Sequence, residues 1–346
     1  MYLSPSRLLR FLIVTLVAFC ALPAHAQVAV QSSPFTVNTS DGVRIYVNHK
    51  FGPAPLKIPV LLIHGTWGNG GTWDFPGRSV MDYLATRGYD VYALDMRGMG
   101  HSDNPGYANI DISSRVEDAR AVAYQIRANT GQAPVVMGWS QGGLITGLLA
   151  TSHPELVAGV GLLSTAPSGF SVPNFQDIQT DLGTLITALL SGKSVPQFIP
   201  SSNNNYNEIK EIVFGTDPIT GKPTISPDAF ATFVSPQFLQ PDSVQAIFEE
   251  IQQVAPPPQA SCQLFLAIGL VRACPVVPWK NINVPALVVD GDLDPLAGEV
   301  DAAALFGALG SKNKQLIVFP RNSHGWFLED NHDATDRVFD QFLSQF

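Results

Sequence analysis

The stretch Gly138-Trp139-Ser140-Gln141-Gly142 decides the fold of this 346-residue chain. It follows an apolar run, Ala133-Pro134-Val135-Val136-Met137, that predicts a buried strand, and it precedes a helix-like stretch at residues 143–150. A serine between two glycines at such a junction is typical of a sharp strand-to-helix turn that exposes the serine hydroxyl. The glycines let the backbone turn and keep the helix close to the strand. We therefore interpret Ser140 as a candidate nucleophile.

Strand and helix patterns alternate on both sides of this turn. The segments 35–39 and 43–47 flank Asp41-Gly42 and predict a β-hairpin. Apolar runs predict strands at 58–63, 91–95, 157–163, 284–290 and 315–319, and helical periodicity predicts helices at 80–87, 112–128 and 333–342. This alternation predicts an α/β fold with a mostly parallel central sheet and helices on both faces.

The alternation stops at about residue 166 and resumes at about residue 281. The segment between them, 167–280, is rich in Pro, Asn and Gln and carries scattered helical patterns. We expect residues 27–166 and 281–346 to form one core, and residues 167–280 to form a largely helical lid inserted at the loop edge of the sheet.

The first 26 residues have the features of a signal peptide. Arg7 and Arg10 precede an apolar run at residues 11–22, and Ala24-His25-Ala26 is a cleavage signal. About 12 apolar residues are too few to cross a bilayer comfortably, so we expect cleavage before Gln27 and no stable membrane anchor afterwards. The protein is then exported, to the periplasm or out of the cell.

Cleavage leaves two of the three cysteines, Cys262 and Cys274, because Cys20 is removed. An even number of cysteines in an oxidising compartment fits one disulfide, and two buried free thiols are the alternative. No histidine lies near this pair in the sequence, so we expect no zinc site there.

Composition and charge describe a soluble globular protein. Hydrophobic residues make up 45% of the chain and charged residues 14%, which fits an ample core rather than disorder. The net charge is −9, and it becomes −11 when Arg7 and Arg10 leave with the signal peptide, because residues 1–26 contain no acidic residue. With no basic patch in the sequence, we expect no nucleic-acid partner.

Five motifs together resemble those of the α/β-hydrolases. In chain order they are His64-Gly65-Thr66-Trp67-Gly68, the stretch DMRGMGHS at 95–102, the pentapeptide around Ser140, Gly291-Asp292-Leu293-Asp294, and Ser323-His324-Gly325. Serine, acid and histidine follow one another in the order of that family. The resemblance covers nearly the whole chain outside the signal peptide and the lid, and it implies the α/β-hydrolase fold and serine hydrolase activity.

The resemblance also implies a catalytic triad of Ser140, Asp294 and His324. Ser140 is the nucleophile and His324 the base that takes its proton. The acid that orients the imidazole follows a strand in a G-x-x-D pattern, which selects Asp294 when counted from Gly291. Asp292 is the alternative acid, whereas Asp290 at the strand end is expected to point along the sheet.

Further residues are assigned around this triad by the same resemblance. The oxyanion hole is formed by the backbone N–H groups of Gln141 and Thr66, with Trp67 as the alternative to Thr66. Trp67 and Trp139 are candidate substrate-binding residues. Arg97 is expected to form an ion pair under the site rather than to contact the substrate.

A serine nucleophile excludes the related haloalkane dehalogenases and epoxide hydrolases, which use aspartate. It favours acyl transfer to water without a metal or organic cofactor. The expected substrate is a small-molecule ester, apolar or aromatic because the lid is rich in phenylalanine. A lactonase, an amidase or a proline-type peptidase could use the same triad, whereas a non-catalytic binder needs none of its three residues. The sequence leaves the oligomeric state open.

Overall fold

The computed structural model describes residues 29–54, 56–65, 68–106, 109–165, 167, 277–294, 297–329 and 332–346. The predicted signal peptide and nearly all of the predicted lid lie outside these residues. So do both cysteines of the predicted disulfide, Cys262 and Cys274, and two residues of the His64 motif, Thr66 and Trp67.

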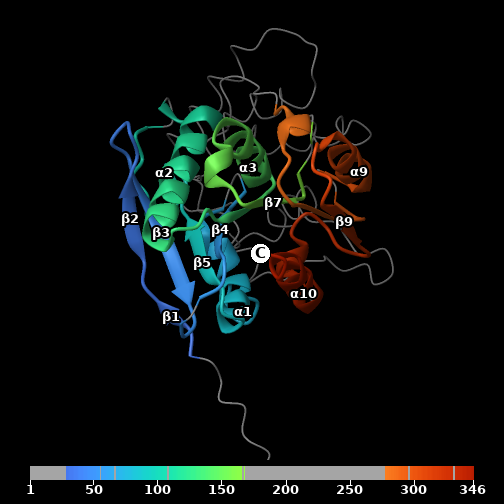
Figure 1. Cartoon of the computed structure of the whole chain (residues 1–346), viewed down its shortest axis with the longest axis horizontal. Helices are drawn as coiled ribbons and strands as arrows, with labels where there is room; N and C mark the ends of the chain where they lie inside the picture. The colour runs from blue at the N-terminus through green and yellow to red at the C-terminus, as the bar shows by residue number, and fades with distance from the viewer. Residues whose placement is uncertain are drawn as a thin grey trace, which may run out of the picture.

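Within the described residues, a nine-stranded sheet forms the centre of the fold, with the order β1-β3-β5-β4-β6-β7-β8-β9 and β2 paired to β3 (Figure 1). Its strands are β1 (Gln31–Ser32), β2 (Phe35–Asn38), β3 (Arg44–Phe51), β4 (Pro59–Ile63), β5 (Asp90–Leu94), β6 (Val135–Trp139), β7 (Gly159–Leu163), β8 (Ala286–Gly291) and β9 (Lys314–Phe319). From β4 to β9 all pairs are parallel, whereas β3 joins β5 antiparallel. The predicted hairpin is the antiparallel β2–β3 pair.

Helices cover both faces of this sheet, as the sequence predicts. They are α1 (Val80–Thr86), α2 (Ile112–Thr130), α3 (Gln141–Ser152), α9 (Glu299–Ala308) and α10 (His332–Leu343). Side chains of α1 and α10 form one core cluster with alternate strand residues such as Leu62, and those of α2, α3 and α9 form the other with residues such as Leu61. The pleat sends successive side chains to opposite faces, so strands covered on both faces are apolar throughout.

Short 3₁₀ turns and caps complete the described core. The 3₁₀ turns are η1 (Gly70–Trp73), η3 (Pro154–Leu156), η6 (Trp279–Asn281) and η7 (Trp326–Leu328). Helix α2 starts at a capping box between Asp111 and Ser114 and ends at Gly131, which has a φ of 76°. The box satisfies the first free N–H groups of the helix, and glycine allows the left-handed end.

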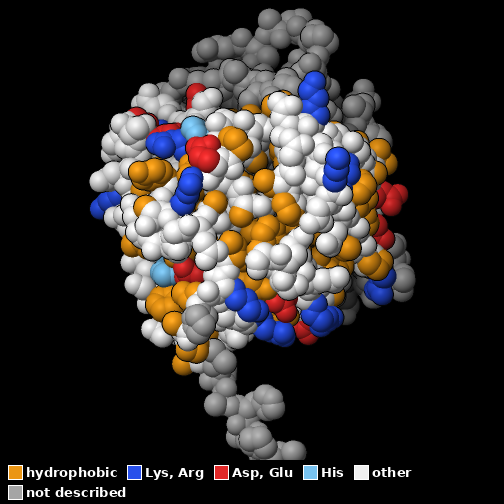
Figure 2. All heavy atoms as spheres, viewed as in Figure 1, with side chains coloured by type: hydrophobic (Ala, Val, Ile, Leu, Met, Phe, Trp, Pro, Cys, Tyr) orange, Lys and Arg blue, Asp and Glu red, His pale blue; other side chains and the backbone are white. Residues whose placement is uncertain are grey.

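The surface carries charges of both signs. On the face shown in Figure 2, Lys and Arg side chains are interspersed with Asp and Glu rather than gathered into one basic patch. Within the described residues, no helix has both the length and the apolar character that crossing a bilayer requires.

Candidate active site

Ser140 lies between β6 and α3 in a strained backbone conformation. Its φ is 56° and its ψ −120°, a region that residues other than glycine rarely adopt. A Cβ on Gly138 would lie 2.0 Å from the carbonyl oxygen of Gly142, and one on Gly142 would lie 2.4 Å from that of Ile63. Only glycine fits at these two positions, which explains the spacing of the pentapeptide.

The side chains of Asp294 and His324 meet although they are 30 residues apart in the chain. Asp294 follows β8, His324 follows β9, and the imidazole Nδ1 lies 2.7 Å from the Asp294 Oδ2. The Asp294 side chain is fully buried, and its Oδ1 accepts a hydrogen bond from the backbone N–H of Ala297 at 3.0 Å. Burial opposes ionisation of Asp294, but the adjacent His324, together with smaller contributions that include the Ala297 N–H, lowers the pKa of this carboxyl. An ionised Asp294 accepts a hydrogen bond from Nδ1–H, so Nε2 is left as the basic atom of the imidazole.

Trp139 connects the serine turn to the histidine loop. Its indole Nε1 donates a hydrogen bond to the backbone carbonyl of His324 at 2.7 Å, and its ring centroid lies 5.3 Å from that of the imidazole. The side chain is fully buried and also packs edge-on against Phe327. These contacts hold His324 beside the residue that precedes Ser140. A direct contact of Trp139 with the substrate stays a prediction.

Glu329, which lies outside the five sequence motifs, holds the histidine loop from the other side. This carboxylate is 2% exposed; it accepts hydrogen bonds from the side chain of Asn322 at 2.7 Å and from the backbone N–H of Ser323 at 3.1 Å. The Ser323 hydroxyl donates to it as well. The sequence does contain a signal for a buried carboxylate, because Glu329 directly follows the apolar residues Trp326-Phe327-Leu328. Buried carboxylates with several donors fix the loops that supply those donors.

His64 lies in the core at the start of the predicted oxyanion loop. Its Nε2 accepts a hydrogen bond from the backbone N–H of Met96 at 3.1 Å, so Nδ1 carries the proton and donates to the carbonyl of Gly65 at 2.6 Å. Burial lowers the pKa of His64 to about 3, which keeps the imidazole neutral. A Cβ on Gly65 would lie 3.3 Å from the Cβ of Ser140. The loop therefore passes directly against Ser140 at Gly65. The next residue, Thr66, lies outside the described residues.

Gln141 is the first residue of α3. The backbone N–H of a first helical residue has no acceptor within the helix, so it is available to bind an anion. The Gln141 side chain is buried and accepts a hydrogen bond from Arg115 of α2. The predicted part of Gln141 in an oxyanion hole would therefore fall to its backbone N–H and not to its side chain.

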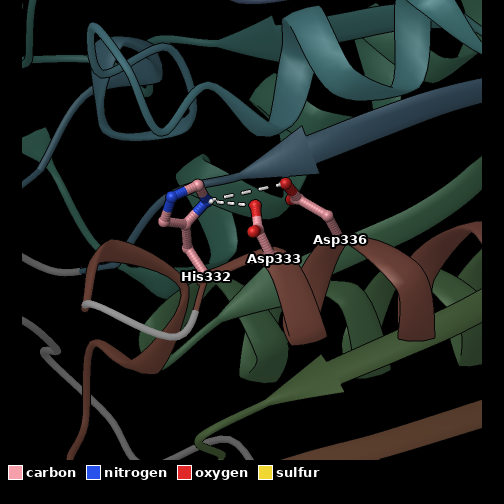
Figure 3. A group of neighbouring side chains, drawn as sticks. All are labelled: His332, Asp333 and Asp336. Atoms are coloured by element: carbon pink, nitrogen blue, oxygen red, sulfur yellow. Dashed lines mark ion pairs between the residues drawn. The ribbon is translucent and has the colours of Figure 1, made fainter.

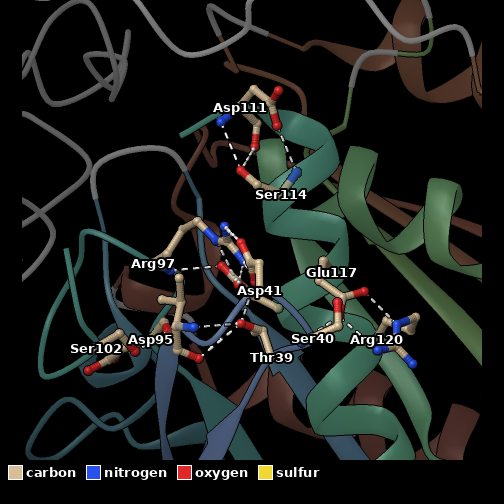
Figure 4. Close-up of polar contacts among 12 residues, drawn as sticks. Thr39, Ser40, Asp41, Asp95, Arg97, Ser102, Asp111, Ser114, Glu117 and Arg120 are labelled. Atoms are coloured by element: carbon tan, nitrogen blue, oxygen red, sulfur yellow. Dashed lines mark hydrogen bonds and ion pairs between the residues drawn. The ribbon is translucent and has the colours of Figure 1, made fainter. Parts of the chain in front are cut away.

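Arg97 forms ion pairs with two aspartates, as the sequence predicts. Its Nε and backbone N–H donate to the carboxylate of Asp118 on α2 at 2.8 and 2.9 Å, and its two terminal nitrogens donate to Asp41 at 2.7 and 3.1 Å (Figure 4). The Arg97 side chain is 2% exposed and Asp118 is fully buried. Burial raises the pKa of Asp118 to about 6 although Arg97 opposes this rise. Arg97 therefore joins the hairpin turn to α2.

A cluster of three titratable side chains lies at the start of α10. Among the described residues, His332, Asp333 and Asp336 are the group whose donor atoms lie close enough to share a metal ion (Figure 3). The His332 Nδ1 is 3.6 Å from Asp333 and 3.7 Å from Asp336, and Asp333 is 76% exposed. Burial and the charge of Asp333 raise the pKa of Asp336 to about 7. Asp333 lies in the first turn of α10, where the helix dipole favours an acidic residue, so its position does not require a metal ion.

The chain belongs to the alpha/beta hydrolase family, whose model matches residues 60–339. It is 31% identical over 166 residues to a triacylglycerol lipase of Pseudarthrobacter phenanthrenivorans, a match that covers 45% of this chain and 48% of the lipase. It is 26% identical over 190 residues to a pimeloyl-acyl-carrier-protein methyl ester esterase of Vibrio campbellii, which covers 52% of this chain and 65% of the esterase. The chain thus spans less than two thirds of the length of either relative.

The fold agrees with this family. An esterase structure from Exiguobacterium antarcticum is similar with a TM-score of 0.62 at 18% identity, covering 89% of this chain and 98% of the esterase. An esterase structure from a Rhodococcus species gives a TM-score of 0.60 at 20% identity, covering 90% of this chain and 98% of that esterase. The predicted α/β-hydrolase fold is therefore confirmed.

Proposed function

We propose that this protein is a serine esterase that hydrolyses carboxylic esters through an acyl-enzyme on Ser140. The observation that carries the proposal is the buried Asp294–His324 pair, whose histidine backbone is hydrogen bonded to the residue before the strained Ser140. A buried acid, an oriented imidazole and a serine on a sharp turn are the three parts that nucleophilic acyl transfer requires.

The chemistry follows from these roles. The His324 Nε2 takes the Ser140 proton as the serine oxygen attacks the ester carbonyl, and the backbone N–H groups of Gln141 and Thr66 stabilise the resulting oxyanion. His324 then gives the proton to the leaving alcohol. Water, activated by the same imidazole, releases the acid and restores Ser140. The net reaction converts one ester and one water into one carboxylic acid and one alcohol.

The substrate is proposed to be an ester with an apolar or aromatic part. The lipase and the methyl ester esterase among the relatives are both named for ester substrates. The phenylalanine-rich segment 167–280 and Trp67 would supply apolar surface beside Ser140.

A series of p-nitrophenyl esters of increasing acyl length tests the proposal. We expect the Ser140→Ala variant to lose at least about 10³-fold in kcat. Ser152→Ala, an exposed position on the same helix, should match the wild type. Equal turnover in wild type and Ser140→Ala would exclude Ser140 as the nucleophile. Turnover of lactones or of peptides with free N-termini, but of no ester, would replace the esterase by the corresponding hydrolase.

Export and oxidation belong to the same proposal. The mature protein is expected to begin at Gln27 and to carry a Cys262–Cys274 disulfide. Intact mass measurement of protein from the periplasm and the medium, with and without reduction and alkylation, tests both. A full-length mass, or two alkylated thiols without reduction, would contradict them.

A further inference from the structure

Asp290 is a buried carboxyl group next to the proposed triad acid. It lies near the end of β8 and is fully buried. Its Oδ1 accepts hydrogen bonds from the backbone N–H of Gly291 at 2.8 Å and from the hydroxyl of Ser164 at 3.2 Å. The Ser164 oxygen in turn accepts a hydrogen bond from the Trp326 indole at 2.9 Å. One oxygen of Asp290 is thus supplied with donors by two neighbouring segments.

The other oxygen, Oδ2, has a different environment. Within the part of the chain that the structure describes, no amide or hydroxyl donor reaches it. The neighbouring acid is Asp294: its backbone N–H donates to the carbonyl of Gly291 at 3.2 Å in the turn that joins the two acids, and the two carboxyl groups influence each other's ionisation. Two carboxyl groups can share a hydrogen bond only when one of them carries a proton. Asp294 already accepts from His324 and Ala297, so the proton belongs on Asp290.

The charges around Asp290 agree with this assignment. Its titratable neighbours are Asp294 and, through Asp294, His324, whereas Ser164 and Trp326 are neutral. In the described residues no lysine or arginine forms an ion pair with it. Burial, together with the adjacent Asp294 carboxylate, raises the pKa of Asp290 well above its ordinary value.

We propose that Asp290 is a neutral carboxylic acid whose Oδ2–H donates to the Asp294 carboxylate and fixes its orientation toward His324. Asp290 is then a positioning residue, and this role rests on the proposed function of Asp294 as the triad acid. A fixed carboxylate keeps the imidazole in the productive tautomer and orientation, which is the task of the triad acid.

Substitutions at Asp290 test the role in catalysis. Asp290→Asn keeps a neutral donor, so we expect kcat within about threefold of the wild type and an unchanged acid limb of the kcat/KM pH profile. Asp290→Ala removes the donor, and we expect kcat to fall about 10- to 100-fold with little change in KM, an effect that asparagine rescues. If Asp290 were ionised, asparagine would remove a negative charge near His324 and move the acid limb down by about one pH unit. That shift, or a wild-type kcat in Asp290→Ala, would overturn the proposal.

Infrared difference spectroscopy tests the protonation state without any substrate. At about pH 8 the spectrum of the wild type minus that of Asp290→Asn should show the carbonyl band of a protonated carboxylic acid. The exposed Asp292 is a matched control, and Asp292→Asn should leave that band in place. Absence of the band in the wild type would overturn the proposal even if Asp290→Ala fails to fold. If the wild type hydrolyses no ester, the proposed function fails, and the band still decides the state of Asp290.

Discussion

The indole of Trp139 and the backbone carbonyl of His324 are joined by a hydrogen bond of 2.7 Å between fully buried groups. Trp139 immediately precedes Ser140, so the bond connects the two loops that carry the proposed nucleophile and base. The strained turn fixes one end of this link, and the Glu329 carboxylate holds the loop at the other end through Ser323. The relative position of serine and histidine is thereby fixed by contacts within the described core.

The first prediction concerns this bond. Trp139→Phe keeps most of the ring packing and removes the donor, so we expect kcat to fall about tenfold, the equivalent of one lost hydrogen bond, with KM nearly unchanged. Trp279→Phe is the matched control, because its Nε1 donates to the carbonyl of Pro167 at 3.1 Å on the other face of the sheet. It should cost a similar free energy of unfolding but leave kcat unchanged. Equal kcat in wild type and Trp139→Phe would contradict the link.

The sequence was sufficient to predict the sheet because its central strands are buried on both faces. All residues of β4 to β8 are buried, and such strands read as uninterrupted apolar runs. Helix α9 was not predicted. It is rich in alanine, contains Gly307 and exposes Val300, so its sequence shows no clear division into an apolar and a polar face. The two-residue strand β1 is too short to form a pattern.

The site was predictable only as far as its motifs reach. The motifs selected Asp294 and His324, and the structure places these two in hydrogen-bonding contact. The supporting groups come from distant segments: Ser164 and Asp290 are 126 residues apart and meet only because β7 and β8 are neighbours in the sheet. Contacts of this kind depend on the tertiary arrangement and leave no local spacing in the sequence.

The second prediction concerns the buried Arg97. Arg97→Ala leaves the fully buried Asp118 without its cationic partner, so we expect the free energy of unfolding to fall by about 3–5 kcal/mol in urea titrations. Arg120 is the control, because its pair with Glu117 is partly exposed on the surface of α2 (Figure 4). Arg120→Ala should cost at most about 1 kcal/mol. Similar losses in both variants would contradict the difference in burial.

The third prediction is a pH dependence of stability at Asp336. Its pKa rises from 3.8 in the unfolded chain to about 7 in the folded protein, so the folded state holds a proton that the unfolded state has lost between these values. The stability that the protonated Asp336 carboxyl contributes is therefore fully present below pH 3.8, and it is lost as the pH rises through about 7. Asparagine does not titrate, so Asp336→Asn should stabilise the protein by about 1–4 kcal/mol more at pH 8 than at pH 4.

Thermal melts of Asp336→Asn and of the wild type at both pH values measure this difference. Comparing the two proteins at each pH removes the contribution that the other titrating groups make to stability. Glu299→Gln, at an exposed position in the first turn of α9, is the control and should show little pH-dependent change. An Asp336→Asn effect that is the same at both pH values would show that Asp336 is ionised as readily in the folded as in the unfolded protein.

The last prediction contrasts two glycines that sequence alone does not distinguish. A Cβ at Gly138 would lie 2.0 Å from the carbonyl oxygen of Gly142, and this backbone can move only by separating α3 from β6. We expect Gly138→Ala to lower the free energy of unfolding by about 3 kcal/mol or more and to displace Ser140. Gly307 is exposed within α9, and a Cβ there meets nothing within 4 Å. Gly307→Ala should therefore stabilise the protein by about 0.5–1 kcal/mol, because alanine loses less backbone entropy in a helix. Urea titration of both variants gives the sign of each change in the free energy of unfolding. A Gly138→Ala variant that is as stable as the wild type, or more stable, would mean that the turn around Ser140 is not packed as tightly as these distances require.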